Sequence, residues 1–306
     1  ASCYFATDET MTPQHGLFEE PGNRAQYLEY TLKQGVALDD IKCALRRATS
    51  RLPNVFIAIA FGSNCWDSLQ PLWRPTQLSD FVEQASAKGH LMPANQQDIF
   101  FWVHGETSSD VMPAVIQVSQ AMAVIADLTL DLNGYKAPDA RIITGFVDGT
   151  GNPKGDKRRT AAVVPEGQVG AGGSYVLGQK WTHKLPEFLT LSVPAQEQVM
   201  GRTKETNIEM EGAAMPTNSH VARTDIDVND TPMKMYRRGT PYGNAGDYGL
   251  YFLAFACEQT RFEHVIDSML GKDDGVTDAM MDYSDAQTGS YWFMPSQEDL
   301  DALLMA

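Results

Sequence analysis

The 306-residue chain has little basic charge and no long apolar run. It carries 24 Lys and Arg residues against 39 Asp and Glu residues, which gives a formal net charge of −15. Phosphate backbones and anionic lipid surfaces repel such a chain, so we expect no nucleic-acid partner and no membrane partner. No apolar run reaches about 18 residues, the length at which a transmembrane helix becomes a candidate.

Cysteine is scarce as well. None of the four cysteines stands in a CxxC pair, and no zinc-type spacing of Cys and His occurs. A chain of this length can bury enough surface to fold without disulfides, and unpaired thiols are typical of a reducing compartment. The first residues show no basic segment followed by an apolar core, so no secretory signal is expected. These features together predict a cytoplasmic protein.

Hydrophobic periodicity in the first half predicts strands that alternate with helices. Residues 39–52 and 110–125 carry apolar stripes of helical period, and four apolar segments are typical of strands: residues 26–33, 54–61, 99–104 and 127–132. The order βαββαβ is that of a ferredoxin-like unit. Residues up to about 22 are polar and rich in turn residues, and we expect them to form an arm outside the core.

The second half repeats this pattern less regularly. A helix is predicted at 261–270, short helices within 186–200, and extended segments at 174–183, 219–226, 233–237, 250–255 and 290–294. We therefore predict an α+β fold of duplicated ferredoxin-like modules, of the dimeric α+β barrel type, with antiparallel sheets and peripheral helices. The modules are expected at residues 1–136 and 137–306. A glycine-rich insert at 145–173 begins the second module, and such irregular segments are often functional.

Motifs of several common enzyme classes are absent from the sequence. There is no P-loop, no GxGxxG at a helix start, no HExxH and no GxSxG. The sharpest feature that is present is GFVDGTGNP, in which Asp148 lies between glycines that permit close approach to a ligand. Taken alone, an Asp-Gly pair is usually a turn, a single His such as His220 is usually structural, and the pair Arg237-Arg238 is usually solvated.

Six segments together resemble the dye-decolourising peroxidases, which are haem enzymes, and specifically their bacterial B-type branch. In chain order they are GFVDGTGNP, GRTKETNIEM, NSHVARTDI, MYRRGTPYG, GLYFLAF and TGSYWFMPS. The resemblance is strong over most of the second half and covers the first half mainly through the expected ferredoxin-like unit. It implies a peroxidase that reduces H2O2 through a ferryl intermediate and oxidises dyes and phenolic one-electron donors. It also implies one haem b per chain, bound in the C-terminal module.

The resemblance implies roles for individual residues. His220 matches the axial ligand of the haem iron, Asp148 and Arg237 match the distal catalytic pair, and Arg202 matches the partner of a haem propionate. Further residues expected to bind the cofactor are Leu250, Phe252, Gly149 and Thr150. The second ring nitrogen of His220 needs an acceptor, for which the sequence offers Asp282 and Asp285 without deciding between them.

These residue types suit the chemistry of a peroxidase. A carboxylate can take a proton from bound peroxide and deliver it to the departing oxygen. An arginine stays protonated at any working pH and stabilises the negative charge that develops on that oxygen. An imidazole whose other nitrogen is bonded to an acceptor supplies electron density to the iron.

The chain departs from the family pattern at two positions. Gly151 stands where many relatives have Glu, and Gly239 stands where some have Asn, which removes an amide from the distal side. Bulky dyes require relays to the surface, for which Trp181, Trp292 and Tyr236 are candidates, although each is more typical of packing.

Two other functions remain open on the sequence alone. One is haem handling, as a carrier or iron-releasing factor that uses the same pocket, and the other is a haem-free binding or assembly module. The resemblance further leads us to expect a homo-oligomer, a dimer or larger. We do not expect loading into a protein shell, because no extension follows the last residues.

Overall fold

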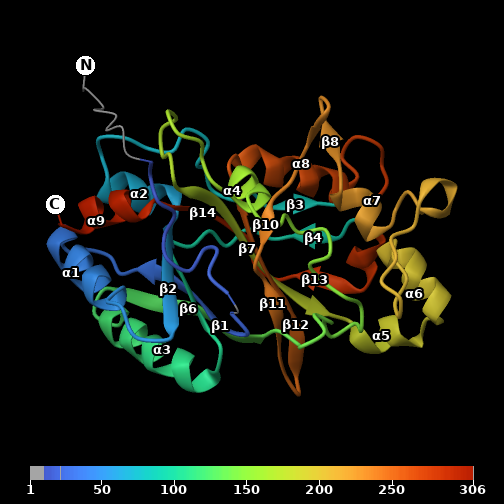
Figure 1. The fold of residues 1–306 in the computed structure, drawn as a ribbon, viewed down its shortest axis with the longest axis horizontal. Helices are drawn as coiled ribbons and strands as arrows, with labels where there is room; N and C mark the ends of the chain where they lie inside the picture. Colours follow the sequence, from blue (N-terminus) through green and yellow to red (C-terminus); the bar gives the residue numbers. More distant parts are fainter. Residues whose placement is uncertain (1–9, 21, 306) are drawn as a thin grey trace.

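A computed structural model describes residues 10–20 and 22–305. Four strands of the first half form one sheet in the order β6-β1-β5-β2, with all neighbours antiparallel. Their bounds are β1 (Arg24–Leu32), β2 (Val55–Phe61), β5 (Ile99–Gly105) and β6 (Ala126–Tyr135). Counted along the chain, this is the order 4-1-3-2 of a ferredoxin-like unit. The predicted βαββαβ arrangement is therefore confirmed (Figure 1).

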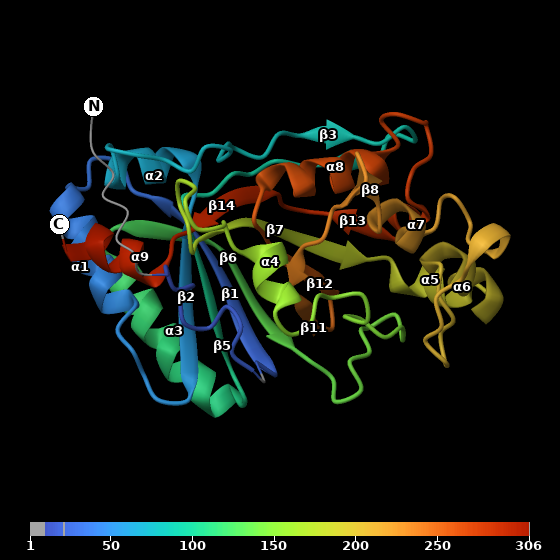
Figure 2. The ribbon, with the colours of Figure 1, turned by 45° about the horizontal axis from the view of Figure 1, so that its top comes forward.

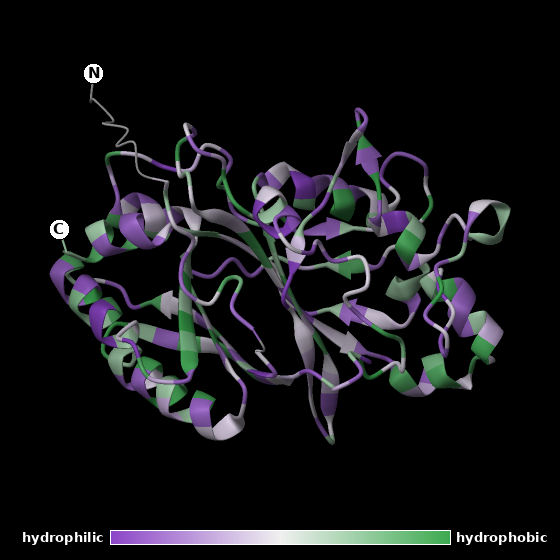
Figure 3. Ribbon diagram, viewed as in Figure 1, coloured by the Kyte–Doolittle hydropathy of each residue, from purple (hydrophilic) through white to green (hydrophobic). Residues whose placement is uncertain are grey.

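Helices α1 (Leu38–Ala48) and α3 (Ser108–Met122) cover the outer face of this sheet. Both are amphipathic, and Figure 3 shows hydrophilic and hydrophobic stretches alternating along them. The helix α3 begins where the side chain of Thr107 accepts a hydrogen bond from the backbone N–H of Asp110. Between β2 and β5 lie three further elements: α2 (Ser63–Leu69), β3 (Gln84–Ala85) and β4 (Leu91–Met92).

The second half repeats the strand order. Its sheet runs β14-β7-β12-β11, which is again 4-1-3-2 when the strands are counted along the chain. These strands are β7 (Ser174–His183), β11 (Thr240–Asn244), β12 (Asp247–Ala256) and β14 (Ser290–Met294), and β13 (Ser284–Ala286) extends the edge of β7. Helix α8 (Gln259–Leu270) joins β12 to β14 and packs on the outer face. The duplication predicted from the sequence is confirmed.

A long connection replaces the first crossover helix of the second half. Between β7 and β11 lie α5 (Leu185–Thr190), α6 (Val193–Met200), η1 (Gly212–Ala214), α7 (His220–Thr224), β8 (Asp227–Val228), β9 (Thr231–Pro232) and β10 (Tyr236–Arg237). The short strand β10 pairs with β12 on the side away from β7. This connection carries two of the predicted site residues, His220 and Arg237.

The two sheets join at both edges, so that the strands form a closed ring. One joint is the pair Tyr242 and Gly134, and the other is the pair Phe293 and Phe61. Side chains on the inner faces form one hydrophobic cluster, and those on the outer faces form a second cluster with the helices. Figure 2 shows the two halves side by side, with α8 lying over the second sheet.

The structure corrects several local expectations. Residues 219–226 are not extended, because 220–224 form helix α7, and the insert at 145–173 contains α4 (Lys157–Ala162). The predicted arm is partly core, since Gln14 and Leu17 are buried; residues 1–9 and Pro21 lie outside the described residues. Among the proposed relays, Trp292 and Tyr236 are buried and Trp181 is half-buried, so Trp181 alone of the three is partly exposed.

The last described helix crosses back to the first half of the fold. Helix α9 (Gln297–Met305) follows β14, and its residues Leu300, Leu303 and Leu304 join the outer hydrophobic cluster beside α1 (Figure 1). The division at residues 136 and 137 stays a prediction. No helix among residues 10–20 and 22–305 is long and apolar enough to cross a membrane.

Candidate active site

Asp148, near the beginning of the glycine-rich insert, faces Arg237 of β10. The Oδ1 of Asp148 lies 3.5 Å from Nη1 of Arg237, and both side chains are about one-third exposed. The same Oδ1 accepts a hydrogen bond of 2.8 Å from the N–H of Gly149, which has a φ of 89°. A residue with a Cβ adopts that conformation only with strain, so glycine allows the backbone to wrap around the carboxylate.

His220 is the first residue of α7 and is held by a buried carboxylate. Its Nδ1 lies 2.7 Å from Oδ2 of Asp278, whose side chain is fully buried, while the His220 side chain is 33% exposed. The hydroxyl of Ser219 caps the helix by accepting from the N–H of Ala222. Since Nδ1 is bonded to Asp278, the imidazole presents Nε2 as its available nitrogen.

The predictions for the acceptor of the His220 ring were wrong. Asp282 instead pairs with His90 and Lys88, and Asp285 pairs with Lys184. Asp278 lies just before η2 (Ala279–Asp282), where its other oxygen, Oδ1, accepts from the N–H of Met280 at 2.9 Å. Sequence reasoning missed it because nothing in the sequence distinguishes Asp278 from Asp282 and Asp285 in the same segment.

Electrostatics connect the histidine with the distal pair. Burial lowers the pKa of His220, but the charge and hydrogen bond of Asp278 outweigh burial and raise that pKa above its ordinary value. Arg237 lowers and Asp148 raises the same pKa by smaller amounts. The structure therefore brings the three predicted residues into one electrostatic neighbourhood, although they lie on three separate segments.

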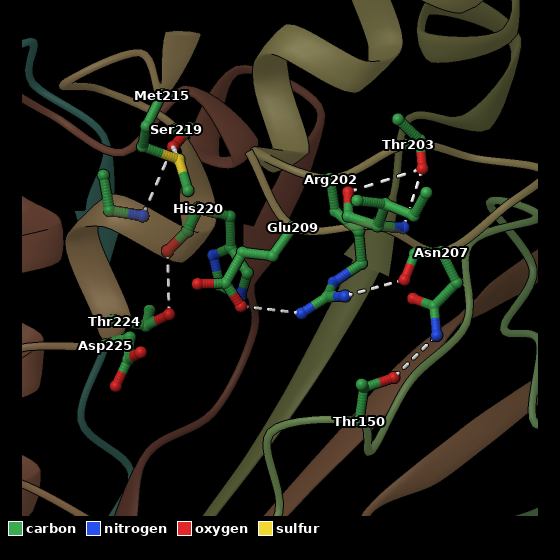
Figure 4. A network of polar contacts seen from close by, with 12 residues as sticks. Thr150, Arg202, Thr203, Asn207, Glu209, Met215, Ser219, His220, Thr224 and Asp225 are labelled. Carbon is green, nitrogen blue, oxygen red and sulfur yellow. Dashed lines mark hydrogen bonds and ion pairs between the residues drawn. The ribbon is translucent and has the colours of Figure 1, made fainter. Parts of the chain in front are cut away.

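Arg202 lies in a loop that reaches both sides of the site. Its side chain is 13% exposed, and its guanidinium donates to Oε2 of Glu209 at 2.9 Å and to the carbonyl of Asn207 at 3.1 Å. Asn207 in turn donates to the hydroxyl of Thr150 at 2.9 Å, as Figure 4 shows. The predicted residues Arg202 and Thr150 are thus brought together through Asn207.

Leu250 and Phe252 lie on the outer face of β12 and are half-buried. Further along the same face, Ala254 and Ala256 are fully buried in the outer cluster, which includes residues of α8. Alternation along the strand points Tyr251 to the opposite face, inside the closed ring. The outer face of β12 is therefore covered at its C-terminal end, whereas the apolar side chains of Leu250 and Phe252, nearer its beginning, stay partly exposed.

Gly239 has no space for a side chain. A Cβ at this position would lie 2.2 Å from the carbonyl oxygen of Tyr251 and 2.9 Å from the N of Leu253. The missing distal amide is therefore excluded by the path of the backbone. At Gly151, by contrast, the nearest atom to an added Cβ is Nη2 of Arg237 at 4.0 Å, so a side chain there would stand beside the distal guanidinium.

A cavity of about 520 Å³ opens onto the distal pair. Asp148 and Arg237 line it, together with Gly149 and Thr150. Its remaining charged lining is mostly basic and consists of Lys136, Arg141, Lys154, Arg158, Arg238 and Glu20. The positive lining of this cavity contrasts with the net charge of the chain and favours small polar or anionic molecules there.

Comparison with known proteins identifies the family. The family model of the C-terminal region of Dyp-type peroxidases matches residues 139–299. The chain belongs to the dye-decolourising peroxidase family. It is 35% identical over 272 residues to a dye-decolorizing peroxidase of Mycobacterium tuberculosis. The matched region covers 87% of this chain and 81% of that protein.

Solved structures of the family share the fold. A dye-decolorizing protein from V. cholerae superposes with a TM-score of 0.85 at 32% identity, over 94% of this chain and 98% of its own. A variant of DypB from Rhodococcus jostii, solved in complex with heme, superposes with a TM-score of 0.88 at 26% identity. The superposition covers 96% of this chain and 99% of the DypB chain. The predicted α+β fold and the enzyme class of a peroxidase, an oxidoreductase, are confirmed; the roles of single residues stay predictions.

Proposed function

We propose that this dye-decolourising peroxidase binds one haem b per chain through Nε2 of His220 and uses it to reduce H2O2. The observation that carries the proposal is the pairing of His220 with the buried Asp278, in the electrostatic neighbourhood of Asp148 and Arg237. A neutral imidazole whose Nδ1–H is bonded to a carboxylate is a typical metal ligand, because the acceptor fixes the ring orientation and raises its basicity.

The donor set fits a haem. One imidazole nitrogen would bind the iron, the uncovered apolar side chains Leu250 and Phe252 would contact the porphyrin, and Arg202 would pair with a propionate. Arg202 already uses donors on Glu209 and Asn207, and a guanidinium has five N–H groups, so donors remain for a further carboxylate. Haem, when bound, supplies the redox chemistry that cleaves the O–O bond.

The distal residues would move the proton and stabilise charge. Asp148 would accept a proton from the inner oxygen of peroxide and deliver it to the outer oxygen, which leaves as water. Arg237 would donate hydrogen bonds to the departing oxygen, where negative charge develops. Because Gly239 adds no amide on the distal side, the step would rely more on Asp148 and Arg237.

Small aromatic reductants, including phenols and dyes, are proposed as the electron donors. A cytoplasmic location fits the free cysteines Cys43, Cys65 and Cys257 among the described residues. We further propose a homo-oligomer and a functional boundary near residue 136, after which the site residues begin. Haem handling as the main role is not favoured, because the named relatives are peroxidases.

The decisive experiment is the visible spectrum of the haem-reconstituted protein before and after one equivalent of H2O2. We expect a Soret band that changes within seconds, a His220→Ala variant that binds haem weakly, and a matched His264→Ala variant, on the exposed side of α8, that behaves as the wild type. A Soret band that ignores peroxide would favour haem handling instead. Absence of any Soret band would overturn the proposal.

A further inference from the structure

Asn152 makes an unusual pair of contacts with the backbone of the distal arginine. Its Oδ1 accepts a hydrogen bond of 2.9 Å from the N–H of Arg237, and its Nδ2 donates one of 2.9 Å to the carbonyl of the same residue. A side-chain amide offers a donor and an acceptor on adjacent atoms, as a backbone amide does. One side chain therefore takes the place of a neighbouring strand at the outer edge of β10.

In the part of the chain that the structure describes, no other strand lies beside the edge that Asn152 covers. Strand β10 pairs there with β12, through Tyr236 with Phe255 and Arg237 with Ala254, and the N–H of Arg238 bonds the carbonyl of Leu253. In an antiparallel pair, successive residues direct their N–H and C=O groups to opposite sides. The polar backbone groups of Arg237 thus point away from β12, toward Asn152.

Asn152 is also tied to Asp148 through a short turn. Its own N–H donates to the carbonyl of Gly149 at 3.1 Å, and the N–H of Asp148 donates to the carbonyl of Ala140 at 2.9 Å. One end of this turn therefore holds the carboxylate, and the other end holds the backbone of Arg237. A Cβ added at Gly151 would lie 4.0 Å from Nη2 of Arg237, so the turn runs beside the Arg237 side chain.

We propose that Asn152 is a positioning residue that fixes the 3.5 Å approach of Asp148 to Arg237. The inference rests on the proposed peroxidase function of this pair. Asn152 touches neither peroxide nor haem in this scheme, and it acts by joining the two segments that carry the acid/base group and the cation. Among the hydrogen bonds and ion pairs of residues 10–20 and 22–305, the other connection between the turn and β10 is the 3.5 Å ion pair, in which both partners are partly solvated.

The test compares Asn152→Ala with Asn244→Ala, in which the same kind of side chain is removed from the exposed end of β11, before the turn to β12. Both proteins are reconstituted with haem, and the reaction with H2O2 is followed by stopped flow. We expect the second-order rate constant to fall about 10- to 100-fold in Asn152→Ala, as misplacement of reacting groups by about 1 Å can cause. The control should match the wild type, and haem affinity should be unchanged in both.

A double-mutant cycle separates positioning from a general structural role. In the Asp148→Ala background the pair no longer exists, so adding Asn152→Ala should change the peroxide rate constant by no more than about twofold. Equal losses in both backgrounds, or a parallel loss of haem affinity, would overturn the proposal. Failure of the wild type to react with peroxide would instead overturn the proposed function, which keeps the two failures distinct.

Hydrogen exchange on the haem-free chain gives a readout that needs no activity. In Asn152→Ala the Arg237 amide loses its acceptor and should exchange faster, whereas the Arg238 amide, bonded to Leu253, should keep its protection. The Asn244→Ala control should leave both unchanged. Unaltered exchange at Arg237 in Asn152→Ala would show that the side chain does not hold this strand and would overturn the proposal.

Discussion

The contact between His220 and Asp278 makes the sharpest prediction about the cofactor. Asp278→Asn keeps the size of the side chain but replaces one acceptor oxygen with an NH2 group. If that NH2 faces His220, it donates to Nδ1 and moves the ring proton to Nε2, the atom that must bind iron. If the NH2 faces the other way, it opposes the N–H of Met280, which in the native protein donates a hydrogen bond to the Asp278 carboxylate. The first orientation reverses the hydrogen bond to His220, and the second leaves the N–H of Met280 without its acceptor.

The size of the effect follows from the geometry of the contact. The Nδ1 to Oδ2 distance of 2.7 Å and the full burial of Asp278 describe a charge-assisted hydrogen bond, worth about 1.5–3 kcal/mol. A factor of ten in affinity corresponds to about 1.4 kcal/mol, and loss of the partner of a ligating histidine typically weakens metal binding about 10- to 100-fold. We expect a loss of haem affinity in that range.

The assay is a titration of the haem-free protein, read from the Soret band. Asp282→Asn is the matched control, since Asp282 stands four residues later and pairs with His90 and Lys88 on the surface. Thermal melts of both haem-free variants show whether the fold survives. Equal haem affinity for wild type and Asp278→Asn, or an equal loss in Asp282→Asn, would refute the assignment of Asp278 as the partner of the ligand.

Three further predictions concern buried charge, the cavity and the distal backbone. Burial raises the pKa of Glu29 to about 8. Between pH 4.5 and 8 the unfolded chain ionises at Glu29 while the folded chain keeps the proton, so the folded state loses stability as the pH rises. The melting temperature of Glu29→Gln, measured relative to the wild type, should therefore increase across this pH range. Lys154→Glu reverses a charge on the cavity wall, so it should raise the KM for an anionic aromatic donor at low ionic strength but not at high ionic strength, where salt screens the charge. Lys33→Glu makes the same change outside the cavity and should leave the KM unchanged. Gly239→Asn should lower the free energy of unfolding by about 1–3 kcal/mol in denaturant titrations, because its Cβ would strike the carbonyl of Tyr251.

The sequence was sufficient to predict the strands of the first sheet and the duplication, but the predictions missed β11 and wrongly gave residues 219–226 as extended. A strand whose two faces are both buried has a nearly continuous apolar run, as in Ile99–Gly105, in which every residue is buried. Helix α7 was not predictable in this way, because its five residues are too few for an apolar stripe and none is buried. The helix exists because Ser219 caps it, a local hydrogen bond that hydrophobic periodicity does not report.

The site was predictable only where its residues lie in recognisable segments. Asp148, Arg237 and His220 each stand inside a motif, so resemblance selected them. Asp278 lies outside these segments and acts through one hydrogen bond to His220, 58 positions away. Asn152 lies inside GFVDGTGNP, but its two hydrogen bonds reach Arg237, 85 positions away, and the motif does not reveal them. Such contacts are fixed by the tertiary fold, and in one sequence nothing distinguishes Asp278 from the nearby Asp282.

The duplicated fold also explains why the site lies in the second half. In the first module, α1 and α3 cover the outer face of the sheet, and residues such as Phe101 and Val103 are fully buried there. In the second module α8 takes the place of α3, but the connection that corresponds to α1 is drawn out into α5, α6, α7 and loops. Leu250 and Phe252 therefore stay half-buried on a sheet that lacks its second covering helix. A flat apolar ligand held by His220 would complete this face, so the same departure from the ferredoxin-like pattern would provide both the space for a haem and the segment that carries its ligand.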